Sequence, residues 1–227
     1  MKEERFLQIQ QYMHVRMSDS AHDREHVYRV LYNALEIARH ESDVDYDVLI
    51  CACLLHDIGR EAQFQNPGVC HAEAGAREAL CFLTDLGCGQ KFTEDVAHCI
   101  LCHRYKGGPA PQSLEAKILF DADKLDVCGA MGIARTLLYG GQTGEPLYTL
   151  DAGGNPLDGT QDTSPSFFRE YHYKLEGLYD KFYTARGAEL AARRQKAAAD
   201  FYESLLAEAS EAYKRGRSEL ALRLSGE

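Results

Sequence analysis

Residues 47–60 read DVLICACLLHDIGR, an apolar run that ends in a histidine–aspartate pair. Continuous apolar character predicts a buried helix, with Asp47 placed to cap its start and Gly59 suited to the left-handed conformation after a helix end. His56 and Asp57 then stand at the end of a buried helix, where a charged pair costs several kcal/mol unless it is paired or bound to a metal. We therefore expect the pair to belong to a functional site.

Helical periodicity extends outward from this run over most of the chain. Apolar residues recur at intervals of three and four, and stretches rich in glycine and proline separate the helical segments. The expected helices beyond the central run cover residues 25–41, 71–86, 93–103, 113–137 and 166–216. No segment shows the alternating pattern of a strand, so the sequence predicts an all-α protein.

The chain divides into three expected parts. Residues 1–139 form a helical core that carries the site, and residues 166–227 form a helical C-terminal subdomain that packs on this core. Between them, residues 140–165 are rich in Gly, Pro, Asp and Thr, which predicts an irregular loop that could serve as a lid. Residues 61–68 are expected to form a shorter loop.

Composition narrows the class of function. The chain has 227 residues, of which 45% are hydrophobic and 26% charged, as in an ordinary globular protein. Its 25 basic and 35 acidic residues give a net charge of −10, which opposes binding to nucleic acid or to an anionic membrane. The N-terminus lacks the apolar run of a secretory signal, and no window is apolar enough to span a membrane, so we expect a cytoplasmic protein that acts on a small molecule.

Side chains that can bind metal follow one another in order along the chain. They are His26, His56, Asp57, His71, His103 and Asp123. Neutral imidazoles together with carboxylates suit Mn²⁺, Fe²⁺, Zn²⁺ or Ni²⁺, and suit Mg²⁺ less because of the many nitrogen donors. The sequence therefore predicts a divalent-metal site.

Several blocks of this chain resemble motifs of the HD superfamily of metal-dependent phosphohydrolases, in particular its bacterial nucleotide pyrophosphohydrolase branch. The blocks are HDREHVYRV at 22–30, CLLHDIG at 53–59, SLEAKILFDADKLD at 113–126, GAMGIAR at 129–135 and YGGQTGEPLY at 139–148. The resemblance implies an HD-domain helical bundle. It also implies that His26, His56, Asp57 and Asp123 bind the metal, with Asp123 preferred over Asp121 because it stands second in Asp-Ala-Asp.

The number of metal ions stays open at this point. The block CHAEAGA at 70–76 is similar to other HD branches in which extra histidines hold a second ion, and His71 and His103 would be its ligands, with Asp57 as the bridge. In the alternative interpretation, His71 caps or begins a helix, and His103 either supports the metal ligands from behind or contacts the substrate. Mn²⁺ is the expected ion, with Fe²⁺, Ni²⁺, Zn²⁺ and Mg²⁺ as alternatives.

The implied chemistry is hydrolysis of a nucleotide or another small phosphate compound, such as a nucleoside triphosphate to monophosphate and pyrophosphate. A metal neutralises phosphate oxygens and activates water, and Asp57 or Asp123 would accept the proton of that water. The residues expected to bind phosphate are Arg29, Arg60, Lys106 and Lys124. Asp126 is expected to support the site or to cap a neighbouring element.

Two other classes of function remain as alternatives. One is a di-iron oxygenase built on the HD fold, and the other is a non-catalytic, nucleotide-binding regulatory module. The helical stripes of the C-terminal part could pack internally or against a second copy of the chain, so a homo-oligomer is also compatible with the sequence.

Overall fold

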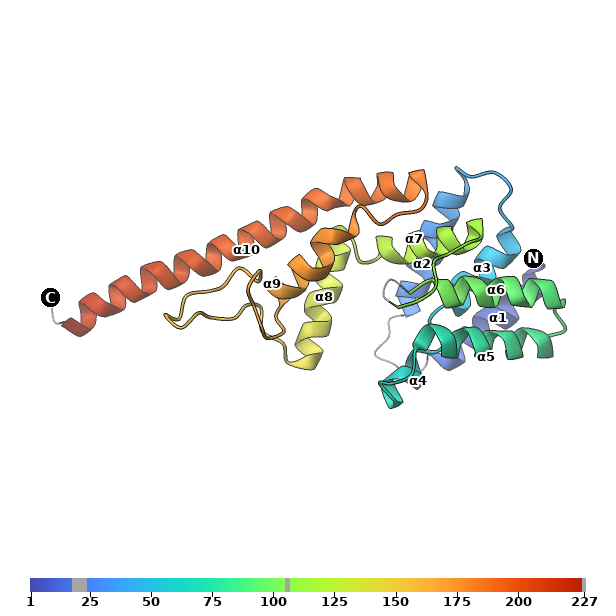
Figure 1. Cartoon of the computed structure of the whole chain (residues 1–227), viewed down its shortest axis with the longest axis horizontal. Helices are drawn as coiled ribbons and strands as arrows, with labels where there is room; N and C mark the ends of the chain where they lie inside the picture. The colour runs from blue at the N-terminus through green and yellow to red at the C-terminus, as the bar shows by residue number, and fades with distance from the viewer. Residues whose placement is uncertain (18–23, 105–106, 226–227) are drawn as a thin grey trace. The chain divides into compact units, whose positions relative to one another are not determined.

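The computed structural model describes residues 1–17, 24–104 and 107–225 (Figure 1). These residues are predominantly helical, and the prediction of an all-α protein is confirmed. Among them, the β structure amounts to an isolated bridge between Leu150 and Pro156. None of the helices in this part of the chain combines the length and the apolar character that crossing a membrane would require.

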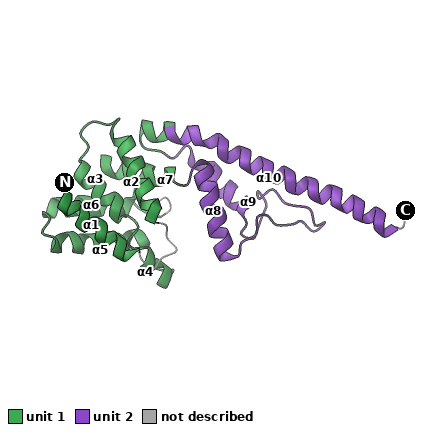
Figure 2. Cartoon of the chain, turned by 180° about the vertical axis from the view of Figure 1, so that it is seen from behind, with its two compact units in different colours: residues 1–126, 182–189 green, residues 127–181, 190–227 purple. Residues whose placement is uncertain are grey.

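The described residues form two compact units, coloured separately in Figure 2. Unit 1 comprises residues 1–126 and 182–189, and unit 2 comprises residues 127–181 and 190–227. The sequence-based division into three parts, with boundaries after residues 139 and 165, differs from these two units and stays a prediction.

Unit 1 contains the central run of the sequence as its most buried helix. Its helices are α1 (Glu3–Arg16), α2 (Arg24–Ala38), α3 (Tyr46–Leu55), α4 (Arg60–Gln65), α5 (His71–Asp85), α6 (Gln90–Cys102) and α7 (Leu114–Leu125). Helix α3 contacts α1, α2, α6 and α7, so it is covered on all sides. Every residue of α3 from Cys51 to Leu55 is fully buried, which agrees with its uniformly apolar sequence.

Both ends of α3 differ from the expectation. The predicted cap Asp47 is wrong: the side chain of Asp45 accepts hydrogen bonds from the backbone N–H groups of Asp47 and Val48, at 3.0 and 3.1 Å. Gly59 is not left-handed either, since its φ is −81°. The need for glycine there comes from packing, because a Cβ atom would lie 2.2 Å from the carbonyl oxygen of His71.

Further boundaries differ from the sequence-based prediction, among them the segment expected to be helical over 166–216, which is interrupted between Leu178 and Ala185. Residues 61–68 were expected to be a loop, yet residues 60–65 form α4, which contributes no buried residue and therefore lacks an apolar stripe that would reveal it. The single helix expected over 113–137 is divided into α7 and α8 (Gly129–Thr143). Gly129 has a φ of +63°, a conformation that interrupts a helix and that glycine adopts at little cost.

Within unit 1, Asp121 binds the turn that leads into α10 (Ala185–Ser225), since residues 182–189 belong to this unit. Its carboxylate accepts hydrogen bonds from the backbone N–H groups of Tyr183 and Thr184 and from the hydroxyl of Thr184, at 2.6 to 3.1 Å. In the same turn, Arg186 forms an ion pair with Glu36 of α2. Asp121 is fully buried, and these hydrogen bonds engage both of its carboxylate oxygens.

Unit 2 is organised around aromatic rings. It contains α8, the short α9 (Phe167–Glu170), a π-helical turn over Tyr171–Leu175, a 3-10 turn over Glu176–Leu178, and α10 beyond residue 189. The rings of Tyr171 and Tyr202 stack with centroids 4.2 Å apart, and Phe168 is fully buried against Tyr202. Residues 144–166 are largely irregular, whereas residues 140–143 of the expected loop form the end of α8. The predicted role of this segment as a lid stays a prediction.

Candidate metal centre

Five segments of unit 1 bring the predicted metal-binding side chains into one buried cluster, which we call the pocket. His26 lies on α2, His56 and Asp57 in the turn after α3, His71 at the start of α5, His103 at the end of α6, and Asp123 on α7. The four histidine residues are each at most 4% exposed, Asp57 is 3% exposed, and the side chain of Asp123 is 14% exposed. Burying so many polar groups together costs free energy unless they bind a common ligand or pair with one another.

The side chains form two groups that meet at Asp57. The ligand atoms of His26, His56 and Asp123 all lie within 4.8 Å of one another, and so do those of Asp57, His71 and His103. One carboxylate oxygen of Asp57, Oδ2, lies 3.6 Å from the Nε2 atoms of His26 and His56. The other, Oδ1, lies 3.6 Å from Nε2 of His103 and 3.9 Å from that of His71. Asp57 therefore faces both groups, as a bridging carboxylate would.

Every histidine of the pocket is oriented through its Nδ1 atom. The partner oxygens belong to the carboxylate of Asp126, the backbone of Cys53, the side-chain amide of Gln63 and the backbone of Ile100, at 2.7, 2.7, 2.9 and 2.6 Å from His26, His56, His71 and His103 respectively. Amide and ionised carboxylate oxygens only accept hydrogen bonds, so each Nδ1 carries the proton. In the neutral ring, Nε2 then presents its lone pair to the pocket, as metal-binding histidines do.

Two of these Nε2 atoms, those of His71 and His103, are buried and have no hydrogen-bond partner. A buried acceptor without a partner costs about 1–3 kcal/mol. The donor set of imidazole nitrogens and carboxylate oxygens fits a divalent transition metal, which would satisfy both atoms.

Burial and neighbouring charges set the protonation of the pocket. Burial lowers the pKa of His56 to about 4, and burial together with the nearby Arg60 lowers that of His71 to about 3, so both are neutral. Burial opposes ionisation of Asp57 and Asp123, yet adjacent basic groups, Arg60 and Lys124 foremost, hold the pKa of each well below its usual range. Both carboxylates are therefore anionic at neutral pH.

His26 behaves differently from the other histidines. Burial lowers its pKa, but hydrogen bonds to Asp123, Asp126 and Asp57 outweigh burial and raise the pKa to about 10. A proton on His26 and a metal ion are thus alternative positive charges for the same carboxylates.

Glycine lets α5 approach the histidine–aspartate turn closely enough to deliver His71. A Cβ atom on Gly59 would lie 2.5 Å from the backbone nitrogen of Gly75, besides its clash with His71. A side chain at position 59 would push the start of α5 away from Asp57.

Basic side chains surround the two carboxylates. Arg60 Nε donates to Asp57 Oδ1 at 2.9 Å, and Lys124 Nζ donates to Asp123 Oδ2 at 2.9 Å. Arg29 Nε donates to Asp126 at 2.7 Å, so Arg29 supports the carboxylate that orients His26, and its predicted role in binding substrate stays a prediction. Lys106 lies outside the described residues.

Sequence reasoning missed Gln63, which orients His71 from α4. Its segment has no apolar periodicity, and nothing in the sequence links it to His71 eight residues later. Asp126 was expected to support the site or to cap an element, and it occupies both places, as the cap of α7 and as the acceptor for His26.

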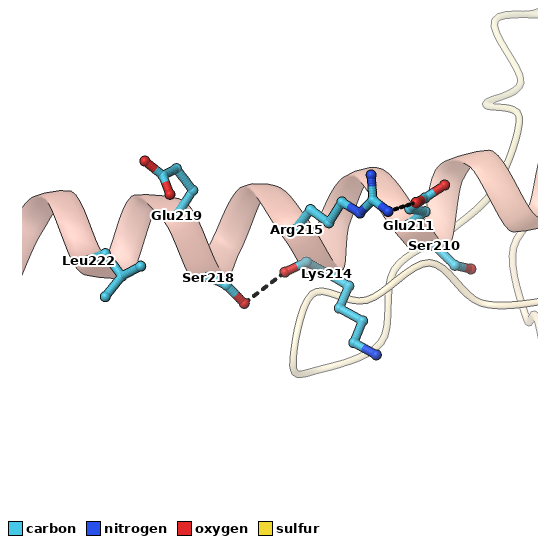
Figure 3. A pocket seen from close by; sticks show the side chains of 7 residues that line it. All are labelled: Ser210, Glu211, Lys214, Arg215, Ser218, Glu219 and Leu222. Atoms are coloured by element: carbon cyan, nitrogen blue, oxygen red, sulfur yellow. Dashed lines mark hydrogen bonds and ion pairs between the residues drawn. The ribbon is translucent and has the colours of Figure 1, made fainter.

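A hollow on α10 offers a contrast with the pocket (Figure 3). Its volume is about 570 Å³, and seven residues of the one helix line it: Ser210, Glu211, Lys214, Arg215, Ser218, Glu219 and Leu222. The charges there pair along the helix, as Arg215 does with Glu211, and none of the lining side chains is a histidine or a cysteine. The pocket around Asp57 is the stronger candidate for chemistry.

The chain is similar to known proteins. Residues 24–128 match the HD domain, a segment that contains all the predicted metal ligands. The uncharacterized protein YpgQ of Bacillus subtilis is 30% identical over 190 residues, which cover 82% of this chain and 83% of that protein.

Solved structures are similar over nearly the whole chain. YpgQ in complex with ADP has a TM-score of 0.69 at 25% identity, covering 90% of this chain and 95% of that one. A predicted HD superfamily hydrolase from an uncultured Thermotogales bacterium has a TM-score of 0.59 at 31% identity, covering 91% of this chain and 92% of that one. An HD-superfamily hydrolase from Bacillus thuringiensis has a TM-score of 0.69 at 27% identity, covering 92% of this chain and 98% of that one.

Proposed function

The chain belongs to the HD superfamily of hydrolases, and from that membership we propose that it is a metal-dependent phosphohydrolase acting on a nucleotide. The observation that carries the proposal is the arrangement of four imidazoles whose Nδ1 atoms are held from outside, so that their Nε2 atoms face two ionised carboxylates. Burying this arrangement without a metal costs free energy, and a metal-dependent hydrolase needs such a set of ligands.

The ligands we propose are His26, His56, Asp57 and Asp123 for a first ion, and Asp57, His71 and His103 for a second. The position of Asp57 between the two groups, with one oxygen toward each, favours two ions over one. Mn²⁺ is the ion we expect, with Fe²⁺, Ni²⁺, Zn²⁺ and Mg²⁺ as alternatives that metal analysis would distinguish. A divalent ion at such ligands neutralises phosphate oxygens and lowers the pKa of water towards 7.

The chain's own side chains supply the remaining parts of the reaction. In the proposed reaction, water attacks the α-phosphorus of a nucleoside triphosphate, the α–β anhydride bond breaks, and pyrophosphate leaves with its bonding electrons. Asp57 or Asp123, ionised at neutral pH, accepts the proton of the water. Arg60 and Lys124 lie beside these carboxylates and bind phosphate oxygens.

Two lines of support favour a nucleotide among phosphate compounds. The YpgQ structure contains ADP, and this chain is similar to YpgQ over most of both lengths. The net charge of −10 opposes a polymeric nucleic acid as substrate but not a small nucleotide held by local cations.

The test is product analysis with defined metals. Metal-stripped protein is reloaded with Mn²⁺ and offered nucleoside triphosphates, diphosphates and monophosphates, and pyrophosphate and orthophosphate are measured separately. Asp57→Asn is the test variant, and Asp85→Asn, at the exposed end of α5, is the matched control. Metal-dependent release of pyrophosphate that Asp57→Asn loses and Asp85→Asn retains supports the proposal.

Other outcomes would redirect it. Orthophosphate released from monophosphates would keep the hydrolase and change the substrate. Nucleotide binding without turnover under any metal would indicate a regulatory module, and oxygen consumption with iron would indicate an oxygenase.

A further inference from the structure

Each carboxylate of the pocket already has a basic partner in this chain. Arg60 contacts Asp57, and Lys124 contacts Asp123, each through one hydrogen bond of 2.9 Å. The Lys124 side chain is 6% exposed, so this pair is secluded from water, whereas that of Arg60 is 32% exposed. Attraction between opposite charges is strong where water is largely excluded, so these are not ordinary surface pairs.

Each of the two pairs places one cation against one carboxylate: Arg60 against Asp57, and Lys124 against Asp123. His26 also lies against both carboxylates, and the neighbouring Asp126 has its own cation, Arg29. A divalent ion would bring further positive charge to the same oxygens. The pocket would then hold an excess of positive charge, which a phosphate compound can neutralise.

We propose that Lys124 and Arg60 are exchangeable counterions: they neutralise Asp123 and Asp57 in the free chain and transfer to phosphate oxygens when a divalent ion occupies these carboxylates. The inference rests on the proposed function, because it concerns the same pocket and the same class of ligand. It adds that the two side chains oppose metal binding and favour phosphate binding.

Lys124 is held in place for such a transfer. Besides Asp123, its Nζ atom donates to the backbone oxygen of His103 at 3.4 Å and lies 4.7 Å from the centroid of the Phe120 ring. These contacts keep the ammonium group at the pocket after it leaves the carboxylate. Arg60 is the first residue of α4, and its partly exposed side chain can turn from Asp57 toward an incoming anion.

The proposal predicts effects of opposite sign for one substitution. Removing the charge of Lys124 removes a cation that competes with the metal, so Lys124→Met should bind Mn²⁺ more tightly, by a factor on the order of 10. The same variant lacks a phosphate partner, so with Mn²⁺ bound it should bind pyrophosphate on the order of 10-fold more weakly. If Lys124 only stabilised the fold, its replacement would weaken the binding of both Mn²⁺ and pyrophosphate.

The experiment is calorimetric titration of the full, metal-stripped chain with Mn²⁺, followed by titration of the Mn²⁺-saturated protein with inorganic pyrophosphate. The variants are Lys124→Met, Arg60→Met and, in case the apolar side chain impairs folding, Lys124→Gln, whose amide can still donate to His103. Lys91→Met is the matched control, since Lys91 forms a Lys–Asp pair of 2.8 Å with Asp95 on the exposed surface of α6.

Tighter Mn²⁺ binding together with weaker pyrophosphate binding in the Lys124 and Arg60 variants, and no change in Lys91→Met, supports the proposal. Mn²⁺ affinity that is unchanged or reduced in folded Lys124 variants overturns it. This test measures binding alone. If the variants show these opposite effects on Mn²⁺ and pyrophosphate binding while the wild-type protein hydrolyses no nucleotide, the proposed function is refuted and the counterion exchange stands.

Discussion

Asp126 provides the sharpest test of how the pocket is organised. The residue is 1% exposed, and its carboxylate accepts hydrogen bonds from Nδ1 of His26 at 2.7 Å and from Arg29 at 2.7 and 3.1 Å. Asp126→Ala would leave a buried imidazole N–H and a partly buried guanidinium without this acceptor. Breaking a buried charged pair costs about 3–5 kcal/mol, so we expect a loss of that size in the free energy of unfolding.

The variant should also lose metal affinity through the orientation of His26. Removing the partner of a metal-binding histidine weakens metal binding by roughly 10- to 100-fold, which corresponds to about 1.4–2.8 kcal/mol. Asp126→Asn should recover part of this loss, because the amide oxygen can still accept from His26. Calorimetric titration with Mn²⁺, at a temperature where thermal denaturation shows each variant to be folded, measures the effect.

Asp121→Ala is the matched control. Asp121 lies on the same helix and is fully buried, but its hydrogen bonds go to Tyr183 and Thr184 and none of them orients a histidine. It should reduce the free energy of unfolding and leave the Mn²⁺ affinity of the folded protein within about threefold, a span of less than 1 kcal/mol. Wild-type affinity in folded Asp126→Ala, or an equal loss in Asp121→Ala, would refute the orienting role.

Three further measurements test other parts of the structure. Gly59→Ala places a Cβ atom against the backbone of α5, so it should lower the free energy of unfolding by about 3 kcal/mol and weaken Mn²⁺ binding. Gly177→Ala is the control, because open space surrounds Gly177, and thermal denaturation should show a loss of less than about 1 kcal/mol. Hydrogen bonds from Arg186 lower the pKa of Glu36 below its ordinary 4.5, so wild type should be more stable than Arg186→Gln at pH 7. This difference in stability should shrink as the pH falls below 4.5, and a difference independent of pH contradicts a stabilising contact between Arg186 and ionised Glu36. In alkylation at pH 8, exposed Cys81 should react quickly while the buried thiols of α3, whose pKa burial raises, stay unmodified until the protein unfolds, and early labelling of α3 would contradict the buried position of that helix.

The sequence alone was sufficient for the fold class, the family and the identity of the side chains that meet in the pocket. The apolar run of α3 indicates a buried helix by itself, and a His-Asp pair at its end is conspicuous because charge is costly there. Asp123 lies with His26 and His56, whereas Asp121 accepts hydrogen bonds from Tyr183 and Thr184. The choice of Asp123 over Asp121 as a ligand stays a prediction. Helical periodicity is a local property, so it survives without knowledge of the tertiary structure.

Only the tertiary structure decided how those side chains face one another. Gln63 and Asp126 orient their histidines from eight and one hundred residues away, and Asp57 presents a different oxygen to each group of ligands. The same holds for Gly59, whose role is close packing against α5 and not the turn its position suggested. Such relations depend on how helices pack, and packing is set by contacts between residues distant in sequence, which periodicity and local spacing do not contain.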